Sequence, residues 1–210
     1  ITEGLVGSEM CIRDRICSAM SRVVVHKSVK DELVQKLANM ANGLKVGAGN
    51  EDGVELTPLI SEQQLQKVEN FARSGQQAGA TAVAGGKRID RDGYFFEATV
   101  FDNVKPDMTI AQEEIFGPVL SVLTYEDEAE AVHIANDTAY GLAAGVFTKD
   151  IDQATNTVNQ LQAGQVYVNS WFTGSIATPF GGYKQSGYSR EKGQEAIKGY
   201  LQVKNVGIQL

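Results

Sequence analysis

Short apolar runs alternate with helix-like segments along most of this chain, and this alternation constrains its fold more than any other feature. Runs rich in β-branched residues predict strands, whereas apolar residues at every third or fourth position predict helices. The predicted strands are Val23–His26, Thr81–Ala84, Phe95–Phe101, Val119–Tyr125, Ala143–Thr148 and Gln165–Asn169. Strands that alternate with helices are typical of parallel β-α-β units. The sequence therefore predicts an α/β fold, a parallel sheet with helices on both faces.

Helix starts are marked by capping residues. Ser28 is expected to cap a helix whose first turn holds Asp31 and Glu32. Ser61, with Gln64 three positions later, predicts a second capped helix. The residues expected on the apolar faces of these two helices are Leu33, Leu37, Met40, Leu44, Leu65, Val68, Phe71 and Ala72. Further helices are predicted at Ala129–Asn136 and Ile151–Leu161.

The pattern changes after Trp171, where a glycine-rich loop covers Thr173–Tyr188. A last helix is predicted over Ser189–Tyr200 and a terminal strand over Tyr200–Leu210. An end strand outside the main pattern can pair within a subunit or between subunits.

Composition excludes several classes of protein. Hydrophobic residues make up 42% of the chain and charged residues 21%, which suits a soluble globular core. The net charge of −7 argues against a nucleic-acid or anionic membrane partner. No apolar run approaches the roughly 20 residues of a membrane helix. Ile1–Arg15 lacks the pattern of a secretory signal and is expected to be a loose terminus, so a cytoplasmic location is expected.

The chain has two cysteines, Cys11 and Cys17, in no pattern of metal ligands or paired redox thiols. No metal site or disulfide framework is expected. Cys17 lies among small residues just before the predicted strand Val23–His26, where a thiol can stay accessible. Taken alone, a cysteine is more often a small buried hydrophobe. His26 and His133 are expected to be structural, which leaves a cysteine hydrolase without a histidine partner.

Two further stretches carry chemistry. Gln112–Val119 places two acids before an aromatic residue and a Gly-Pro break, and we expect it at the carboxyl side of a strand, where ligands bind in α/β sheets. A carboxylate there can accept hydrogen bonds from sugar hydroxyls; the alternative is a solvated acidic turn. Pro179–Gly187 has paired glycines that allow positive φ and close approach to a ligand. The alternative for this segment is a structural hairpin with a surface lysine.

Together these stretches resemble the carboxyl-terminal half of the aldehyde dehydrogenase superfamily. The family's nucleophile motif, Gly-Gln-x-Cys-x-Ala-x-x-Arg, is similar to Ile16–Arg22. Its Glu-Glu-Ile-Phe-Gly-Pro-Val signature stands at Glu113–Val119, and its Pro-Phe-Gly-Gly-x-Lys-x-Ser-Gly segment stands at Pro179–Gly187. The resemblance extends from about Ile16 to Leu210 with matching order and spacing.

The resemblance implies a role for each matched residue. Cys17 would be the nucleophile, and its backbone N–H would be one donor to the oxyanion. Glu114 would hold the ribose hydroxyls beside the nicotinamide, which Phe116 and Phe180 would line.

Further roles follow from weaker matches. Gln64 and Lys67 are similar to the family's contacts to the adenosine ribose side of the cofactor. Trp171 and Phe172 fall where the family varies its substrate tunnel. The implied cofactor is NAD or NADP, the substrate a small-molecule aldehyde, and the full-length form a homo-oligomer, a dimer or a tetramer.

The resemblance also implies a division of the chain. Residues 1–15 are expected to be a leader unlike the family, since Asp14 and Arg15 stand where the family has Gly-Gln. Residues 16–188 would be the catalytic domain, and residues 189–210 a helix and an oligomerisation strand. The family's Rossmann domain, general-base glutamate and oxyanion asparagine would lie in an absent amino-terminal part. We therefore expect a truncated enzyme with little activity alone, or alternatively an inactive module for folding or subunit association.

Overall fold

The computed structural model describes residues 16–210. The chain divides into two compact units, and the second of them runs from Ala139 to Leu210. The predicted disorder of residues 1–15 lies outside the described residues. The predicted domain boundary after Tyr188 falls within the second unit and stays a prediction.

The first unit contains a four-stranded sheet with the strand order β1-β4-β3-β2. Its strands are β1 (Arg22–His26), β2 (Thr81–Ala84), β3 (Thr99–Asp102) and β4 (Val119–Tyr125). The strands β1 and β3 both run parallel to β4, whereas β2 pairs antiparallel with β3 at one edge. The predicted α/β fold with a mostly parallel sheet is confirmed.

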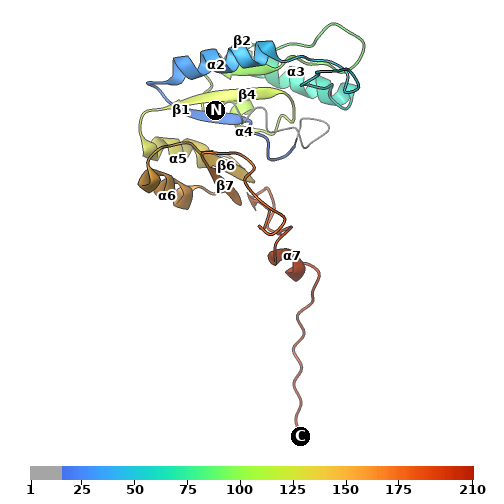
Figure 1. Ribbon diagram of the computed structural model, residues 1–210, viewed down its shortest axis with the longest axis vertical. Helices are drawn as coiled ribbons and strands as arrows, with labels where there is room; N and C mark the ends of the chain where they lie inside the picture. The colour runs from blue at the N-terminus through green and yellow to red at the C-terminus, as the bar shows by residue number, and fades with distance from the viewer. Residues whose placement is uncertain (1–15) are drawn as a thin grey trace. The chain divides into compact units, whose positions relative to one another are not determined.

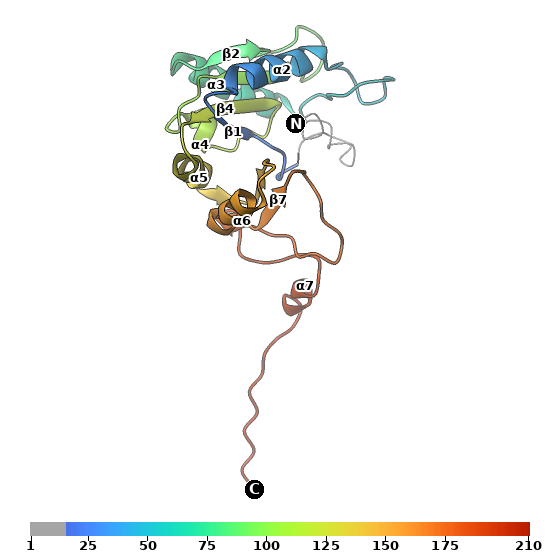
Figure 2. The same cartoon turned by 60° about the vertical axis from the view of Figure 1, so that its left-hand side comes forward.

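Helices cover both faces of this sheet (Figures 1 and 2). They are α2 (Lys30–Gly43), α3 (Glu62–Gln77), α4 (Thr109–Gln112) and α5 (Glu128–Asn136). Side chains of α2 pack with Val100, Leu120 and Val122 on one face. Side chains of α3, α4 and α5 pack with Phe101 and Leu123 on the other. Alternation along the strands thus divides the core into two layers.

The second unit is built from two small sheets. Strands β6 (Ala143–Val146) and β7 (Gln165–Val168) are parallel, with α6 (Ile151–Gln160) in the crossover between them. Strands β5 (Tyr140–Gly141) and β8 (Tyr183–Lys184) pair antiparallel, and α7 covers only Glu195–Lys198.

One of the two predicted helix caps is correct. The Ser61 hydroxyl accepts a hydrogen bond from the Gln64 backbone N–H at 3.2 Å, which caps α3 as expected. The prediction for Ser28 was wrong, because the N-cap position of α2 is Val29, one residue later, and the helix has no side-chain cap. The Ser28 hydroxyl instead lies 2.7 Å from Nδ1 of His26, so a local turn contact takes the place of the cap.

Three predicted elements differ from the structure. The third strand was predicted over Phe95–Phe101 but covers Thr99–Asp102, and Phe96 only makes an isolated bridge with Arg88. The last helix is a single turn. The predicted terminal strand does not form within this single chain, because residues 201–210 have no regular secondary structure and are exposed; its pairing between subunits stays a prediction. An isolated strand needs a partner ladder for its hydrogen bonds. Among residues 16–210, none of the helices combines the length and the apolarity needed to cross a membrane.

Candidate active site

Cys17 lies in a tight turn, the cysteine turn, Ile16–Ala19. The Ala19 N–H donates to the Ile16 carbonyl at 2.9 Å and closes the turn. The Cys17 side chain is an exposed free thiol, whereas Ser18 beside it is buried. The chain then enters β1 at Arg22. The sequence expectation of an accessible thiol before an anchored strand fits this geometry.

The acidic loop, Glu113–Pro118, lies at the same edge of the sheet as the cysteine turn. Arg22 is paired with Ser121 in the parallel ladder of β1 and β4, so both strands begin at this edge. The Ser121 N–H donates to the Ser21 carbonyl at 3.0 Å, which continues the ladder towards the cysteine turn. Both segments immediately precede these strands, and the two therefore share the amino-terminal edge of the sheet.

This placement corrects one expectation. We expected the acidic loop at the carboxyl side of a strand, but it precedes β4 and lies at its amino end. The cause is α4, a short helix that returns the chain from the end of β3 to the start of β4.

The helix α3 holds the acidic loop by its backbone. The Gln64 side-chain amide donates to the Ile115 carbonyl at 2.9 Å and to the Phe116 carbonyl at 3.1 Å. The Lys67 ammonium donates to the Glu114 carbonyl at 2.8 Å. A side chain at Gly117 would meet Val68 at 2.5 Å, so the loop lies tight against the helix there. The structure thus brings Gln64 and Lys67 to the loop that carries Glu114 and Phe116.

The loop presents its functional groups outward. The side chain of Glu114 is exposed, and that of Phe116 is 42% exposed. Phe116 has a positive φ of 56°, a backbone conformation that phenylalanine rarely adopts. The two hydrogen bonds from Gln64 hold the carbonyls of Ile115 and Phe116. Each contributes about 1 kcal/mol to the stability of the fold.

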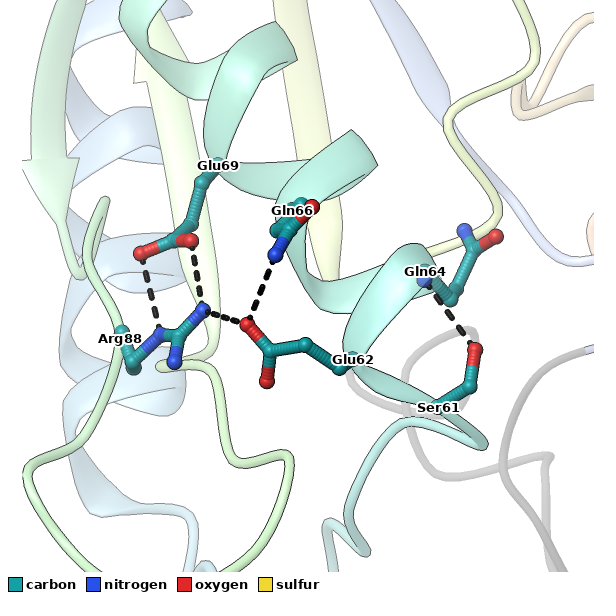
Figure 3. A network of polar contacts seen from close by, with 6 residues as sticks. All are labelled: Ser61, Glu62, Gln64, Gln66, Glu69 and Arg88. Atoms are coloured by element: carbon teal, nitrogen blue, oxygen red, sulfur yellow. Dashed lines mark hydrogen bonds and ion pairs between the residues drawn. The ribbon is translucent and has the colours of Figure 1, made fainter.

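A different face of α3 binds the guanidinium of Arg88, as Figure 3 shows. The Arg88 guanidinium lies 2.7 Å from a Glu62 oxygen and 2.9 Å from a Glu69 oxygen. The hydrogen bond from Arg88 lowers the pKa of the Glu62 carboxyl. The Gln64 side chain points away from this cluster (Figure 3). One face of α3 therefore fixes the segment after β2, and another fixes the acidic loop.

The second unit holds the predicted substrate residues. Trp171 and Phe172 have ring centroids 6.1 Å apart, and both contact the ring of Tyr167 on β7. Burial raises the pKa of Tyr167. The side chain of Asn169 bonds both backbone groups of Thr148, at 2.9 and 2.8 Å, and so sets the start of the turn that carries the two aromatic residues.

The Pro179–Gly187 segment packs against its own unit. The strand β8 pairs with β5, and Lys184 is exposed, as the alternative of a structural hairpin proposed. A side chain at Gly164 would clash with the Gly181 backbone, and one at Gly182 would clash with Ser186. The paired glycines Gly181 and Gly182 do not have a positive φ, whereas Gly187, at the end of the segment, has a φ of 100°. Their close approach serves the fold locally.

Phe180 lies at the start of this segment. Its N–H and carbonyl exchange hydrogen bonds of 2.7 Å with Glu191, and the Lys192 ammonium lies 5.4 Å from the centre of its ring. The structure thus pins the backbone of Phe180 within the second unit.

Sequence reasoning assigned no role to Arg22 or Asn169. Arg22 donates to carbonyls of α4 and α5, and Asn169 closes the β6–β7 pair. Arg22 stood out only as the end of the motif Ile16–Arg22, and Asn169 only as the end of the predicted strand Gln165–Asn169. No group of three or more His, Cys, Asp or Glu residues that could hold a metal ion occurs within residues 16–210.

Comparison with known proteins identifies the family. The family model described as "Aldehyde dehydrogenase family" matches residues 1–206. The chain belongs to the aldehyde dehydrogenase family. The matched range includes residues 1–15, which we expected to be unlike the family.

Relatives within the aldehyde dehydrogenase family are similar over most of the chain. The mitochondrial aldehyde dehydrogenase of Leishmania tarentolae is 46% identical over 91% of this chain and 39% of its own length. The putative aldehyde dehydrogenase DhaS of Bacillus subtilis is 44% identical over 99% of this chain and 42% of its own length. The chain thus spans about two-fifths of the length of these relatives.

Solved aldehyde dehydrogenase structures share the fold. The NAD+ complex of an aldehyde dehydrogenase from Bacillus cereus has a TM-score of 0.90 and 44% identity, covering 96% of this chain and 41% of that one. A betaine aldehyde dehydrogenase mutant from Staphylococcus aureus, in complex with NAD+ and carrying a BME-modified cysteine, has a TM-score of 0.90 and 41% identity, covering 97% of this chain and 42% of that one.

Proposed function

We propose that this chain carries the catalytic cysteine and part of the nucleotide site of an enzyme that oxidises an aldehyde to a carboxylic acid with NAD+ or NADP+. The observation that carries the proposal is the shared sheet edge of the cysteine turn and the acidic loop. Family membership and the NAD+ complexes of similar structures support it.

The acidic loop has the groups that a nicotinamide nucleotide needs. The exposed Glu114 carboxylate offers two acceptor oxygens for vicinal ribose hydroxyls, and the Phe116 ring offers a flat apolar surface. The backbone carbonyls of residues 114–116 are bonded by α3, so the loop does not need the ligand to fix its shape. Direct contacts of Gln64, Lys67 and Phe180 with the cofactor belong to this proposal.

Cys17 would act as the nucleophile. Its thiolate adds to the carbonyl carbon of the aldehyde, a C–S bond forms, and the π electrons of the carbonyl move to the oxygen. The Cys17 backbone N–H would donate to that oxyanion. When bound, the cofactor supplies the acceptor for the hydride that leaves the former aldehyde carbon. Water then cleaves the Cys17 thioester, which releases the acid and restores the thiol.

The aromatic cluster of the second unit would shape the preference for the aldehyde. The rings of Trp171 and Phe172 are partly buried against Tyr167, and such rings bind apolar groups by area and by their faces. The proposal includes a cytoplasmic location and a homo-oligomeric full-length form.

Substitution of Cys17 tests the proposal. In the full-length protein, Cys17→Ser is expected to lower NAD+-dependent aldehyde oxidation by about 10³-fold or more, because the hydroxyl is a far weaker nucleophile than the thiolate. Cys11→Ser is the matched control and is expected to keep activity. The measurement is NADH formation at 340 nm with several aldehydes. A wild-type protein that oxidises no aldehyde, or a Cys17→Ser variant with normal rates, would contradict the proposed function.

The alternative is an association module without activity of its own. Exposed apolar side chains in the last ten residues favour it, namely Leu201, Val203, Val206, Ile208 and Leu210. Analytical ultracentrifugation of the chain, and of a variant that ends at Gly199, tests it. If the chain and the shortened variant are both monomers, the association module is excluded. The module is supported if the chain forms oligomers, the shortened variant does not, and the full-length protein oxidises no aldehyde.

A further inference from the structure

Arg22 lies where the two halves of the proposed site meet. It is the first residue of β1 and stands five positions after Cys17. Its guanidinium donates to four backbone carbonyls, Ala111 at 3.1 Å, Asp137 at 3.4 Å, Ile134 at 2.6 Å and Ala135 at 3.2 Å. Burial lowers the pKa of Arg22, an effect that the charge of Asp137 opposes.

The acceptors of Arg22 belong to two different elements. Ile134 and Ala135 lie in the last turn of α5, where carbonyls lack partners within the helix and a cation is favoured. Ala111 lies in α4, three residues before Glu114. One rigid side chain thus joins the strand that follows Cys17 to the short helix that leads into the acidic loop.

The helix α4 depends on such external contacts. A four-residue helix has almost no internal hydrogen bonds, so its position is set by what binds it. The buried Ser121 hydroxyl donates to the Ile110 carbonyl at 3.0 Å and ties α4 to β4. The Gln112 side chain donates to the Asp137 carbonyl at 2.9 Å. Arg22 adds the link to β1, and α3 holds the far end of the acidic loop.

We propose that Arg22 is a positioning residue that fixes the acidic loop relative to the cysteine turn, and this rests on the proposed function. The planar guanidinium reaches several carbonyls at once because its donors form a fixed fork. A lysine offers a single ammonium on a flexible stem and cannot reproduce that fork. Loss of the link lets α4 shift, and Glu114 shifts with it, while Cys17 stays in the cysteine turn before β1.

The test compares Arg22→Lys and Arg22→Gln with wild type in the full-length protein. Rates are divided by the concentration of folded protein, which the amplitude of the urea unfolding transition gives, so that loss of folded protein does not count. Arg22→Lys is expected to lower kcat about 10- to 100-fold and raise KM for NAD+, since a misplacement of about 1 Å can cost that much. Arg22→Gln keeps a planar donor without the charge, so the test can still be made if Arg22→Lys does not fold.

Arg91→Lys is the matched control. Arg91 forms a surface pair with Glu51 at 3.3 Å and stacks on Phe95, away from the site, so its kinetics are expected to equal those of wild type. If both Arg22 variants keep wild-type kcat and KM per folded protein, the proposal is overturned. It is equally overturned if both variants unfold, because Arg22 would then serve the whole fold.

Amide hydrogen exchange separates this proposal from the proposed function. In the 210-residue chain, Arg22→Lys is expected to speed exchange in Glu113–Gly117 more than in α2. This measurement needs no turnover and stands even if wild type oxidises no aldehyde. Equal acceleration in both segments would reject the positioning role.

Discussion

At the scale of single residues, the proposed site relies on backbone contacts more than on side-chain pairs. Gln64 and Lys67 bind carbonyls of the acidic loop, and Gly117 lets that loop approach Val68. These groups hold Phe116 at its positive φ of 56°. The loop is therefore a rigid part of the α3 surface, and small changes in volume there have large effects.

Two glycines provide a matched test of this packing. Gly117→Ala is expected to lower the free energy of unfolding by about 1–3 kcal/mol, because the added methyl meets Val68 at 2.5 Å. Gly43→Ala, at the end of α2 with no atom within 4 Å, is expected to raise it by about 0.5–1 kcal/mol. Urea unfolding measures both. Equal effects of the two substitutions would contradict the tight approach of the loop to α3.

Lys30 carries a stabilising charge pair. Its ammonium lies 2.6 Å from Asp102, with side chains 18% and 10% exposed, and the hydrogen bond to Asp102 raises the pKa of Lys30. Lys30→Met is expected to cost about 1–3 kcal/mol at pH 7, since Asp102 loses its counter-charge. A group whose pKa is raised by folding stabilises below its unfolded pKa, so the difference from wild type should shrink above about pH 10.

Lys36→Met is the control for that measurement. Its pair with Glu32 is 64% and 71% exposed, and its loss is expected to leave the free energy of unfolding nearly unchanged. If the Lys30 and Lys36 variants lose the same stability, the partly buried pair makes no special contribution.

The sequence predicted the site residues Glu114, Phe116, Gln64 and Lys67 but not the backbone contacts that hold the acidic loop in place. Glu114 and Phe116 stand in a motif that can be read directly, whereas the bonds from Gln64 and Lys67 cross about 50 positions of chain. Arg22 could be seen only as the end of a motif, because its acceptors are backbone carbonyls and leave no side-chain pattern. A side-chain contact to a backbone carbonyl cannot be predicted from the types of the residues, because every residue has such a carbonyl.

At the scale of elements, α3 is the part that organises the first unit. Its buried residues Leu65, Val68 and Ala72 enter the core, while its other faces bind the acidic loop and Arg88. The apolar periodicity and the Ser61 cap predicted this helix well. The helix α4 was missed, because four residues are too few to show a period. The last helix was predicted too long, and none of the residues of the single turn that forms is buried.

The Arg88 cluster makes stability depend on pH at the acid end. Arg88 lowers the pKa of Glu62, so the stabilisation is present above the ordinary value of 4.5 and is lost as pH falls through the lowered value. Arg88→Met is therefore expected to flatten the loss of unfolding free energy between about pH 5 and pH 3. Urea unfolding across that range measures it. Arg73→Met is the control, because Arg73 bonds the neutral Asn70, and an identical flattening in both variants would reject the assignment.

At the scale of the whole molecule, the two units are unequal. Both hydrophobic core clusters lie before Ala139, whereas the buried apolar residues of the second unit are Ala154 and Tyr167. The alternation of strands and helices predicted the fold class but gave no sign of this imbalance, because strand patterns in the second unit look like those in the first. Burial depends on which elements cover each strand, and the alternation of strands and helices along the sequence does not reveal this.

This imbalance predicts different behaviour of the isolated units. Residues 16–138 expressed alone are expected to melt in one cooperative transition, because they keep both core clusters. Residues 139–210 alone are expected to show no cooperative transition, since so little apolar surface is buried. Circular dichroism during heating measures both. A sharp transition in the shorter piece would contradict the expectation.

The left-handed aromatic residues, Phe116 and Phe172, have a consequence for protein engineering. At φ values of 56° and 62°, each pays a conformational penalty that glycine would avoid. A laboratory selection for thermal stability alone would favour the substitutions Phe116→Gly and Phe172→Gly. Under the proposed function, the selected proteins would be more stable but less active, so such a selection must also measure turnover.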